Sequence, residues 1–134
     1  MSLGKDIADF LAAQSQGTVA STIFYGDKPD TPDNLICLYE YAGLQPMTNE
    51  TLDRPGLQVL VRNLSHETAR AAIQAVQNLL MRVGDPNDSV YFDGLVQNTV
   101  QYLRVVPAQG VNLMGKDSRG RVEMTQNFYI TKRR

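Results

Sequence analysis

The sequence predicts an α+β fold in which a single antiparallel or mixed β-sheet has two helices packed on one of its faces. Two segments repeat apolar residues with the 3.6-residue period of an amphipathic helix, and the segments around them carry β-branched and aromatic runs typical of strands. The order helix, strands, helix, strands indicates an α+β domain. No repeat or linker divides the chain, so residues 1–134 are expected to form one domain.

The first expected element is a helix that runs from Leu3 to about Gln14. Its apolar residues recur at positions i, i+4, i+7 and i+8, which places them on one stripe: Leu3, Ile7, Phe10 and Leu11. Gly17 follows and ends the helix. We expect this stripe to pack on the sheet.

Three strands are expected before the second helix, over Thr22–Tyr25, Leu35–Tyr41 and Gly56–Arg62. The first two are separated by Asp27–Asn34, whose prolines and acidic residues favour a solvated loop. The last two are separated by a polar stretch with little periodicity, Gly43–Pro55, which is expected to be a connection.

The third of these strands alternates between apolar and polar residues. The apolar side, which we expect to be buried, consists of Leu57, Val59 and Val61. Gln58 and Arg62 are expected to face the other way.

The second helix is expected to begin at Ser65, whose hydroxyl can accept a hydrogen bond from a free backbone N–H group of the first turn. Glu67 suits the positive end of the helix dipole, and Gly84 closes the segment. Between them lies the most regular 3.6-residue pattern in the chain, made of Ala69, Ala72, Ile73, Val76, Leu79, Leu80 and Val83.

The C-terminal part is expected to contain a turn at Asp85–Asp88 and three strands, at Val90–Phe92, about Asn98–Val106, and Arg121–Thr131. The apolar face of the last strand consists of Val122, Met124, Phe128 and Ile130. The connection Pro107–Gly120 is much longer than a tight hairpin needs, and such a loop is usually functional or disordered.

One motif in this connection is similar to a phosphate-binding loop. Gly110–Lys116 matches the G-x-x-x-x-G-K pattern, in which backbone N–H groups and a lysine hold phosphates. Asp117, however, stands where the magnesium-binding Ser or Thr should be, and its charge opposes phosphate. The next element is expected to be a strand, whereas this mechanism needs a helix N-terminus. The sequence therefore favours a flexible loop over a nucleotide site.

The turn after the second helix offers oxygen ligands for a hard cation, from Asp85, Asn87, Asp88 and Asp93. Their spacing departs from that of a calcium-binding loop, and no glutamate closes it. A solvated turn is the favoured interpretation.

The chain offers few residues that could carry out nucleophilic catalysis. His66 is the only histidine, and it follows Ser65 directly at a helix start, where adjacent residues do not face each other. Cys37 is the only cysteine and lies in an apolar run, so neither an intramolecular disulfide nor a zinc cluster is expected. We predict no catalytic, cofactor-binding or metal-binding residue.

The overall charge favours no particular polyanionic partner, because the formal net charge is −1. The basic terminus, Lys132, Arg133 and Arg134, can contact phosphate or serve as a solubilising tail. No secretory signal and no run of ~18 apolar residues is present, so we expect a soluble protein without a membrane partner.

The order and spacing of several motifs carry a resemblance. Pro32–Asn34 leads into an apolar strand, Arg54–Arg62 leads into the amphipathic helix, and Gly115–Arg121 leads into Val122–Ile130. This layout resembles the minor capsid protein family of tailed phages, related in fold to the tail terminator (tail completion) proteins of long-tailed phages. The similarity spans about Asp6–Arg134.

The resemblance implies a tail-terminator-like structural subunit of a virion or prophage, without cofactor or enzymatic activity, assembled in the cytoplasm of the bacterial host. It implies a ring, commonly a hexamer, at the head-tail junction. Such a ring caps the tail tube, stops polymerisation of the tail-tube protein, joins the head connector protein and leaves a lumen for the genome. Non-specific contact with the passing DNA would then fall to Lys132, Arg133 and Arg134.

The long connection is the candidate contact loop for a neighbouring subunit or the tail tube, through Gly110, Asn112, Met114, Lys116, Asp117, Arg119 and Arg121. The alternative is an unstructured solvent loop in a monomer. The segment Val90–Gln97 is more apolar and acidic than the family leads us to expect, and is either an extra strand or a subunit-specific contact.

Two other functions are consistent with the sequence. One is a head-side connector or completion protein, which shares the small size and the ring. The other is a small ligand-binding or enzymatic domain, which predicts a concave pocket with convergent polar groups.

Overall fold

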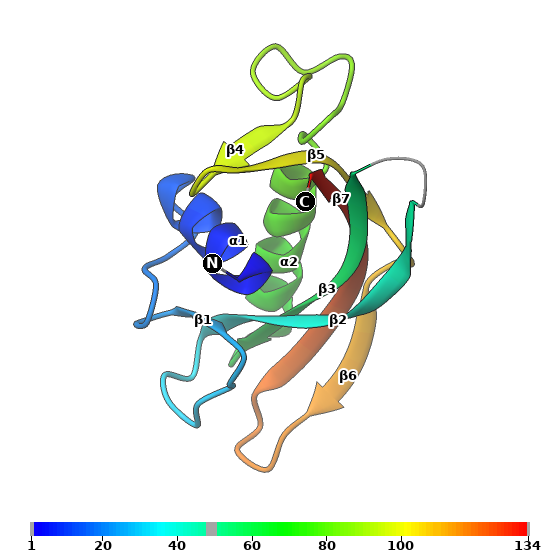
Figure 1. The fold of residues 1–134 in the computed structure, drawn as a ribbon. Coiled ribbons are helices and arrows are strands. Elements are labelled where there is room, and N and C mark those ends of the chain that lie inside the picture. The colour runs from blue at the N-terminus through cyan, green and yellow to red at the C-terminus, as the bar shows by residue number, and fades with distance from the viewer. Residues whose placement is uncertain (1, 48–50, 134) are drawn as a thin grey trace.

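The computed structural model describes residues 2–47 and 51–133, and within them it confirms the α+β fold. Two helices lie against one face of a strongly curled seven-stranded sheet (Figure 1). The elements, in chain order, are α1 (Leu3–Ala13), β1 (Ile23–Tyr25), β2 (Leu35–Met47), β3 (Leu52–Asn63), α2 (His66–Leu80), β4 (Leu95–Gln97), β5 (Val100–Pro107), β6 (Asn112–Lys116) and β7 (Val122–Arg133).

The sheet is mixed, with the strand order β1-β2-β3-β7-β5-β4. β1 runs parallel to β2, and the other paired strands are antiparallel. β7 pairs with β6 near its start and with β5 near its end, both on the side away from β3. Beyond the first half of β7 the sheet therefore ends with β6, and beyond its second half it continues through β5 to β4.

Both helices form as their sequence patterns predict. Ser2 and Ser65 cap them, accepting hydrogen bonds from the backbone N–H groups of Lys5 (3.1 Å) and Thr68 (3.4 Å). Their apolar stripes join the inward side chains of β3 and β7 in one core cluster, which includes Ile7, Phe10, Leu11, Leu57, Val59, Val61, Ile73, Val76, Leu80, Met124, Phe128 and Ile130. Neither helix has the length and apolar character that a membrane crossing requires, over the residues described.

The predicted strand at Val90–Phe92 is wrong. The carboxylate of Asp88 accepts hydrogen bonds from the backbone N–H groups of Val90 (2.9 Å) and Tyr91 (2.7 Å), which holds this segment in a turn. The strand forms instead at β4, directly after Gly94, which has a positive φ of 97°.

Two expected connections are shorter than the sequence suggests. The stretch Gly43–Pro55 is largely strand, because β2 continues to Met47 and β3 begins at Leu52, with register shifts that accommodate the irregular sequence. The connection Pro107–Gly120 contains β6, which pairs with β7. Residues 48–50 lie outside the described part of the chain.

A buried polar network, which the sequence patterns did not indicate, ties α1 to the β4–β5 turn. The carboxylate of Asp6 is fully buried and accepts hydrogen bonds from the Tyr102 hydroxyl and from Nδ2 of Asn98 (2.6 Å). Burial, and then the hydrogen bond to this carboxylate, raise the pKa of Tyr102. The network thus holds the first helix in place with satisfied polar groups.

Candidate functional site

The candidate contact loop is an ordered hairpin, which we call the β6–β7 hairpin (residues 112–125). Asn112, Met114 and Lys116 lie in β6, and their side chains are exposed. Gly110 precedes the hairpin, and Asp117 and Arg119 lie in its turn. The expectation of an unstructured loop is therefore wrong at this point, and whether the hairpin touches a partner stays a prediction.

Asp117 organises the turn of this hairpin. One carboxylate oxygen accepts hydrogen bonds from the backbone N–H groups of Arg119 (3.0 Å) and Arg121 (2.9 Å), and the other accepts from Nε of Arg121 (2.8 Å). Partial burial raises the pKa of Asp117, but these hydrogen bonds and the arginine charge outweigh it and hold the pKa below its usual range. The turn leads into a strand, so the helix N-terminus that a phosphate-binding loop needs does not follow here.

Arg121 connects the hairpin to the β1–β2 loop (residues 26–34). Only 4% of its side chain is exposed, and its guanidinium lies 3.1 Å from Oδ1 of Asp30 and 3.4 Å from Oδ1 of Asp33, besides its contact with Asp117. It also donates to the backbone carbonyl of Asp30. Arg119 makes a second ion pair with Asp30, at 2.9 Å. The hairpin turn is thereby fixed against a loop almost ninety residues earlier in the chain.

Arg62 holds the same loop from β3, and it faces away from the apolar side of that strand, as expected. It does lie on the outer face of β3, but only 2% of the residue is exposed, because the β1–β2 loop folds over it. Nη2 donates to the backbone carbonyls of Pro29 (2.8 Å), Asp30 (3.2 Å) and Pro32 (2.6 Å), and Nε donates to that of Asp33 (3.4 Å).

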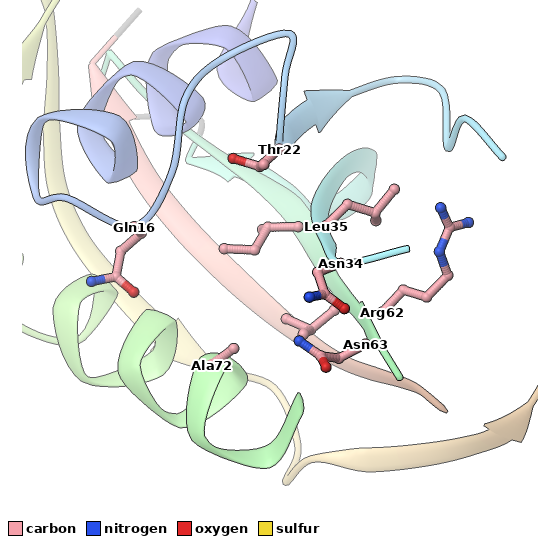
Figure 2. A pocket seen from close by; sticks show the side chains of 9 residues that line it. Gln16, Thr22, Asn34, Leu35, Arg62, Asn63 and Ala72 are labelled. Atoms are coloured by element: carbon pink, nitrogen blue, oxygen red, sulfur yellow. The ribbon is translucent and has the colours of Figure 1, made fainter. Parts of the chain in front are cut away.

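A pocket of about 230 Å³ lies between the segment after α1 and the start of α2 (Figure 2). Its amide groups already serve as local caps: Oδ1 of Asn34 accepts from the Leu64 N–H (3.3 Å), and Oδ1 of Asn63 accepts from the Ser65 N–H (3.1 Å). The guanidinium of Arg62 points away from the labelled amides in Figure 2. The pocket therefore lacks, among the residues described, the convergent reactive groups that an enzymatic site needs.

Two candidate nucleophiles, Ser65 and Cys37, make hydrogen bonds within the fold. The Ser65 hydroxyl accepts the capping hydrogen bond from Thr68, and the neighbouring His66 is exposed. Cys37 is fully buried, and its thiol donates to the backbone carbonyl of Asp27 (3.2 Å). Burial is the main cause that raises the pKa of this thiol, so the reactive thiolate is disfavoured.

The acidic residues after α2 form a turn, as the sequence favoured. Asp88 makes an ion pair with Arg82 (2.6 Å), and Oδ1 of Asp85 accepts from the Asn87 N–H (2.9 Å). The hydrogen bond from Arg82 is the main cause that lowers the pKa of Asp88 to about 2, followed by the hydrogen bond from the Tyr91 N–H. In the described residues no group of three or more His, Cys, Asp or Glu side chains is placed to hold a metal ion.

The basic residues near the C-terminus belong to β7, which continues two residues beyond the predicted end at Thr131. Lys132 is half-buried, and Nε of the exposed Arg133 donates to Oε1 of Gln101 (2.9 Å). Arg134 lies outside the described residues. The strand thus gives Lys132 and Arg133 defined positions, which a free tail would not.

Several large apolar side chains are exposed, and five of the most exposed fall in two regions. One lies around β4, where Val90, Phe92 and Val96 are each more than half exposed, at 62%, 52% and 67%. The other is β6, where Leu113 and Met114 are 54% and 60% exposed. Neighbouring apolar residues with this exposure are typical of protein interfaces.

The chain matches the family described as bacteriophage tail terminator protein over residues 10–134. No curated protein matches it in sequence. Its fold is similar to that of a chain in a solved structure, the virion of native gene transfer agent (GTA) particle, with a TM-score of 0.69 and 15% sequence identity. The alignment covers 99% of this chain and 96% of that chain. At this identity, the likeness concerns the fold.

Proposed function

This chain belongs to the bacteriophage tail terminator family, and we propose that it forms a ring, commonly six-membered, which caps the tail tube and joins it to the head connector. The family match over residues 10–134 carries this proposal, and it confirms the resemblance drawn from the order of the motifs. The chain is a structural protein of the phage tail. The GTA particle supports placement in a virion, since a subunit of that virion has the same fold.

The exposed apolar regions support ring formation. A cyclic ring larger than a dimer needs heterologous contacts, in which two different patches of the same subunit meet. The region around β4, with Phe92 and Val96, and the region at β6, with Leu113 and Met114, are separate surfaces of one sheet. One subunit thus carries more than one exposed apolar surface, as the heterologous contacts of a ring require.

The β6–β7 hairpin is the proposed contact element, with Gly110, Asn112, Met114, Lys116, Asp117, Arg119 and Arg121 at or next to the interface. Arg121 and Asp117 act by fixing the turn, because both are engaged within the subunit. Met114 and Lys116 are exposed and available to a partner. A hairpin fixed before binding loses little entropy on binding.

We further propose that the C-terminal cations face the lumen and contact the passing DNA without sequence preference. Phosphate contacts of this kind weaken as salt increases. The steepness of the plot of log binding constant against log salt concentration decreases by about one for each cation removed. Replacing Lys132 and Arg133 by glutamine in the assembled ring should reduce the slope for duplex DNA by about two. An unchanged slope would remove DNA contact from the proposal.

The direct test of the terminator function is the length of tail tubes. The tail-tube protein of the same phage is polymerised with and without this chain, and tube lengths are measured by negative-stain electron microscopy. We expect a short, narrow length distribution and gold-labelled subunits at one tube end only. Tubes of unchanged length with no label at their ends would contradict the proposal, and label on tailless heads would instead favour the head-side connector.

A further inference from the structure

The described part of the sheet has several edges, and most of them are occupied. The outer edge of β1 is covered by residues 18–20, since the Ala20 N–H donates to the Ile23 carbonyl (2.9 Å). The outer edge of β5 pairs with β4, and farther along the Val105 N–H reaches the Val83 carbonyl (3.4 Å). A paired strand or a covering segment therefore occupies these edges, which is how proteins usually protect them.

Within the described residues, the three-residue strand β4 ends the sheet, and two longer stretches of edge also have no strand beside them. β1 pairs only with Ile36–Leu38, so β2 has no neighbour on its outer side from Glu40 onward. β6 pairs with β7 on one side and has no strand on the other. An open edge that carries apolar side chains is a template for another strand.

We propose that β6 of one copy adds to the open edge of β2 in the next copy, as an antiparallel strand. This proposal rests on the ring proposed above and names the two surfaces that close it. The incoming strand takes the position along β2 at which β1 ends. A groove of about 380 Å³ lies there, lined by Ser2, Gly4, Tyr25, Gly26, Leu38, Tyr39 and Glu40.

Charge complementarity fixes the direction and register of this pairing. Antiparallel alignment of Asn112–Lys116 with Glu40–Leu44 places Lys116 directly opposite Glu40. Both residues are exposed; Oε1 of Glu40 accepts a hydrogen bond from the Gly4 N–H of its own subunit (2.7 Å), so its other carboxylate oxygen, Oε2, is the one that would face the lysine. Oppositely charged cross-strand neighbours stabilise a sheet. A parallel alignment would place the lysine opposite Leu44 and separate the charges. The antiparallel alignment also brings the exposed Leu113 and Met114 against the Ala42–Leu44 end of the edge, where Leu44 is 45% exposed.

The backbone N–H and C=O groups of Glu40 and Lys116 point toward the open edges that this pairing would join. In β2, the Ile36 N–H and the Leu38 carbonyl bond toward β1, so by the alternation of a strand the peptide groups of Glu40 point to the same outer edge. In the hairpin turn, the Asp117 N–H donates to the carbonyl of Arg121, the residue before β7 (2.9 Å), and so points toward the β7 side. The peptide groups of Lys116, one residue earlier, therefore point to the open edge.

The two side chains also lie on the same face of the sheet. Lys116 is the cross-strand partner of Val122, and Glu40 follows Leu38 by two residues in β2. Val122 and Leu38 both belong to the core cluster beneath the helices. Lys116 and Glu40 of adjacent copies would thus meet on the helix-bearing face.

Charge reversal tests this pairing. In Lys116→Glu and in Glu40→Lys, like charges face each other at every interface, and we expect the yield of rings on tube ends to fall by about tenfold or more. The double variant restores opposite charges in swapped positions and should return the yield to within about threefold of wild type. Arg70→Glu, an exposed charge reversal on the outer face of α2, is the matched control. Ring mass is measured by light scattering and mass photometry as a multiple of 14.9 kDa.

Cysteine pairing gives an independent readout. Glu40→Cys and Lys116→Cys proteins are mixed and oxidised in the presence of tubes, and we expect a disulfide-linked dimer from the mixture and none from either protein alone. Glu67→Cys mixed with Lys116→Cys is the control, because Glu67 lies on the exposed side of α2.

The outcomes separate the two proposals. Rings whose yield is unaffected by either single reversal, or a double variant no better than the singles, would overturn the strand pairing and leave the ring intact. A wild-type chain that forms no multimer, alone or on tubes, would overturn the ring and the pairing together.

Discussion

Arg62 provides the sharpest test of how the fold holds its loops. Replacing it by methionine keeps most of the buried stem and removes all four hydrogen bonds that Arg62 donates to the β1–β2 loop. A buried acceptor left without its donor costs about 1–3 kcal/mol, and the four carbonyls can regain some water at the surface, so we expect a total loss of about 3 kcal/mol. For 134 residues, the unfolding entropy is about 0.3 kcal/mol/K, so the melting temperature should fall by about 10 °C.

The assay is urea denaturation followed by circular dichroism, with hydrogen exchange of the loop amides as a local readout. Arg62→Lys should lose about half as much stability, since an ammonium can donate to some of these carbonyls but cannot reproduce the guanidinium geometry. Arg70→Met on the exposed face of α2 is the control, with an expected change within about 0.5 kcal/mol. Equal stability of Arg62→Met and this control would refute the reasoning.

Three further predictions concern single positions. The folded-state pKa of Asp88, about 2, is below its unfolded value, so its ion pair with Arg82 stabilises the protein above about pH 4 and is lost as the pH falls through 2. The difference in melting temperature between wild type and Asp88→Asn should therefore shrink from pH 5 to pH 2, and a constant difference would contradict this. Asp6→Ala leaves the buried Tyr102 hydroxyl without its acceptor and removes one of the two acceptors of Asn98, whose Nδ2 also donates to Asp9 (3.1 Å), so it should cost about 2–3 kcal/mol in urea denaturation, with Asp6→Asn intermediate. Gly84→Ala should cost at least about 2 kcal/mol, because its φ is +78° and the new Cβ would lie 2.2 Å from a backbone carbonyl of β5, whereas Gly110→Ala meets nothing within 4 Å and should be near neutral.

The sequence predicts elements well where burial is periodic. Ile73, Val76 and Leu80 recur at helical spacing because one face of α2 packs on the sheet, and Leu57, Val59 and Val61 alternate because one face of β3 does. β6 lacks such a signal. Leu113 and Met114 are both exposed, so the burial that would produce an alternating pattern is missing within the subunit.

Long-range contacts explain the other differences. The pattern gave the correct face for Arg62 but not its burial, which depends on a loop some thirty residues earlier in the chain folding over it. Val90 has strand character in the sequence, but Asp88 accepts its N–H and that of the next residue, which removes them from any ladder. In both cases a side chain captures backbone groups that hydrophobic periodicity does not register.

The β6–β7 hairpin and the β1–β2 loop are held together by contacts within the subunit. Arg62 on β3 and Arg121, just before β7, both hold the β1–β2 loop. The ion pair between Lys28 and Glu123 (2.5 Å) adds a link between that loop and β7. Because Arg121 also fixes the hairpin turn through Asp117, the direction of β6 is set by contacts inside the subunit. The open edge is therefore ordered before a partner arrives, and the entropy of ordering it is lost in folding and not in assembly. The same arginines that stabilise the fold thus set the geometry with which the hairpin can meet a neighbouring subunit.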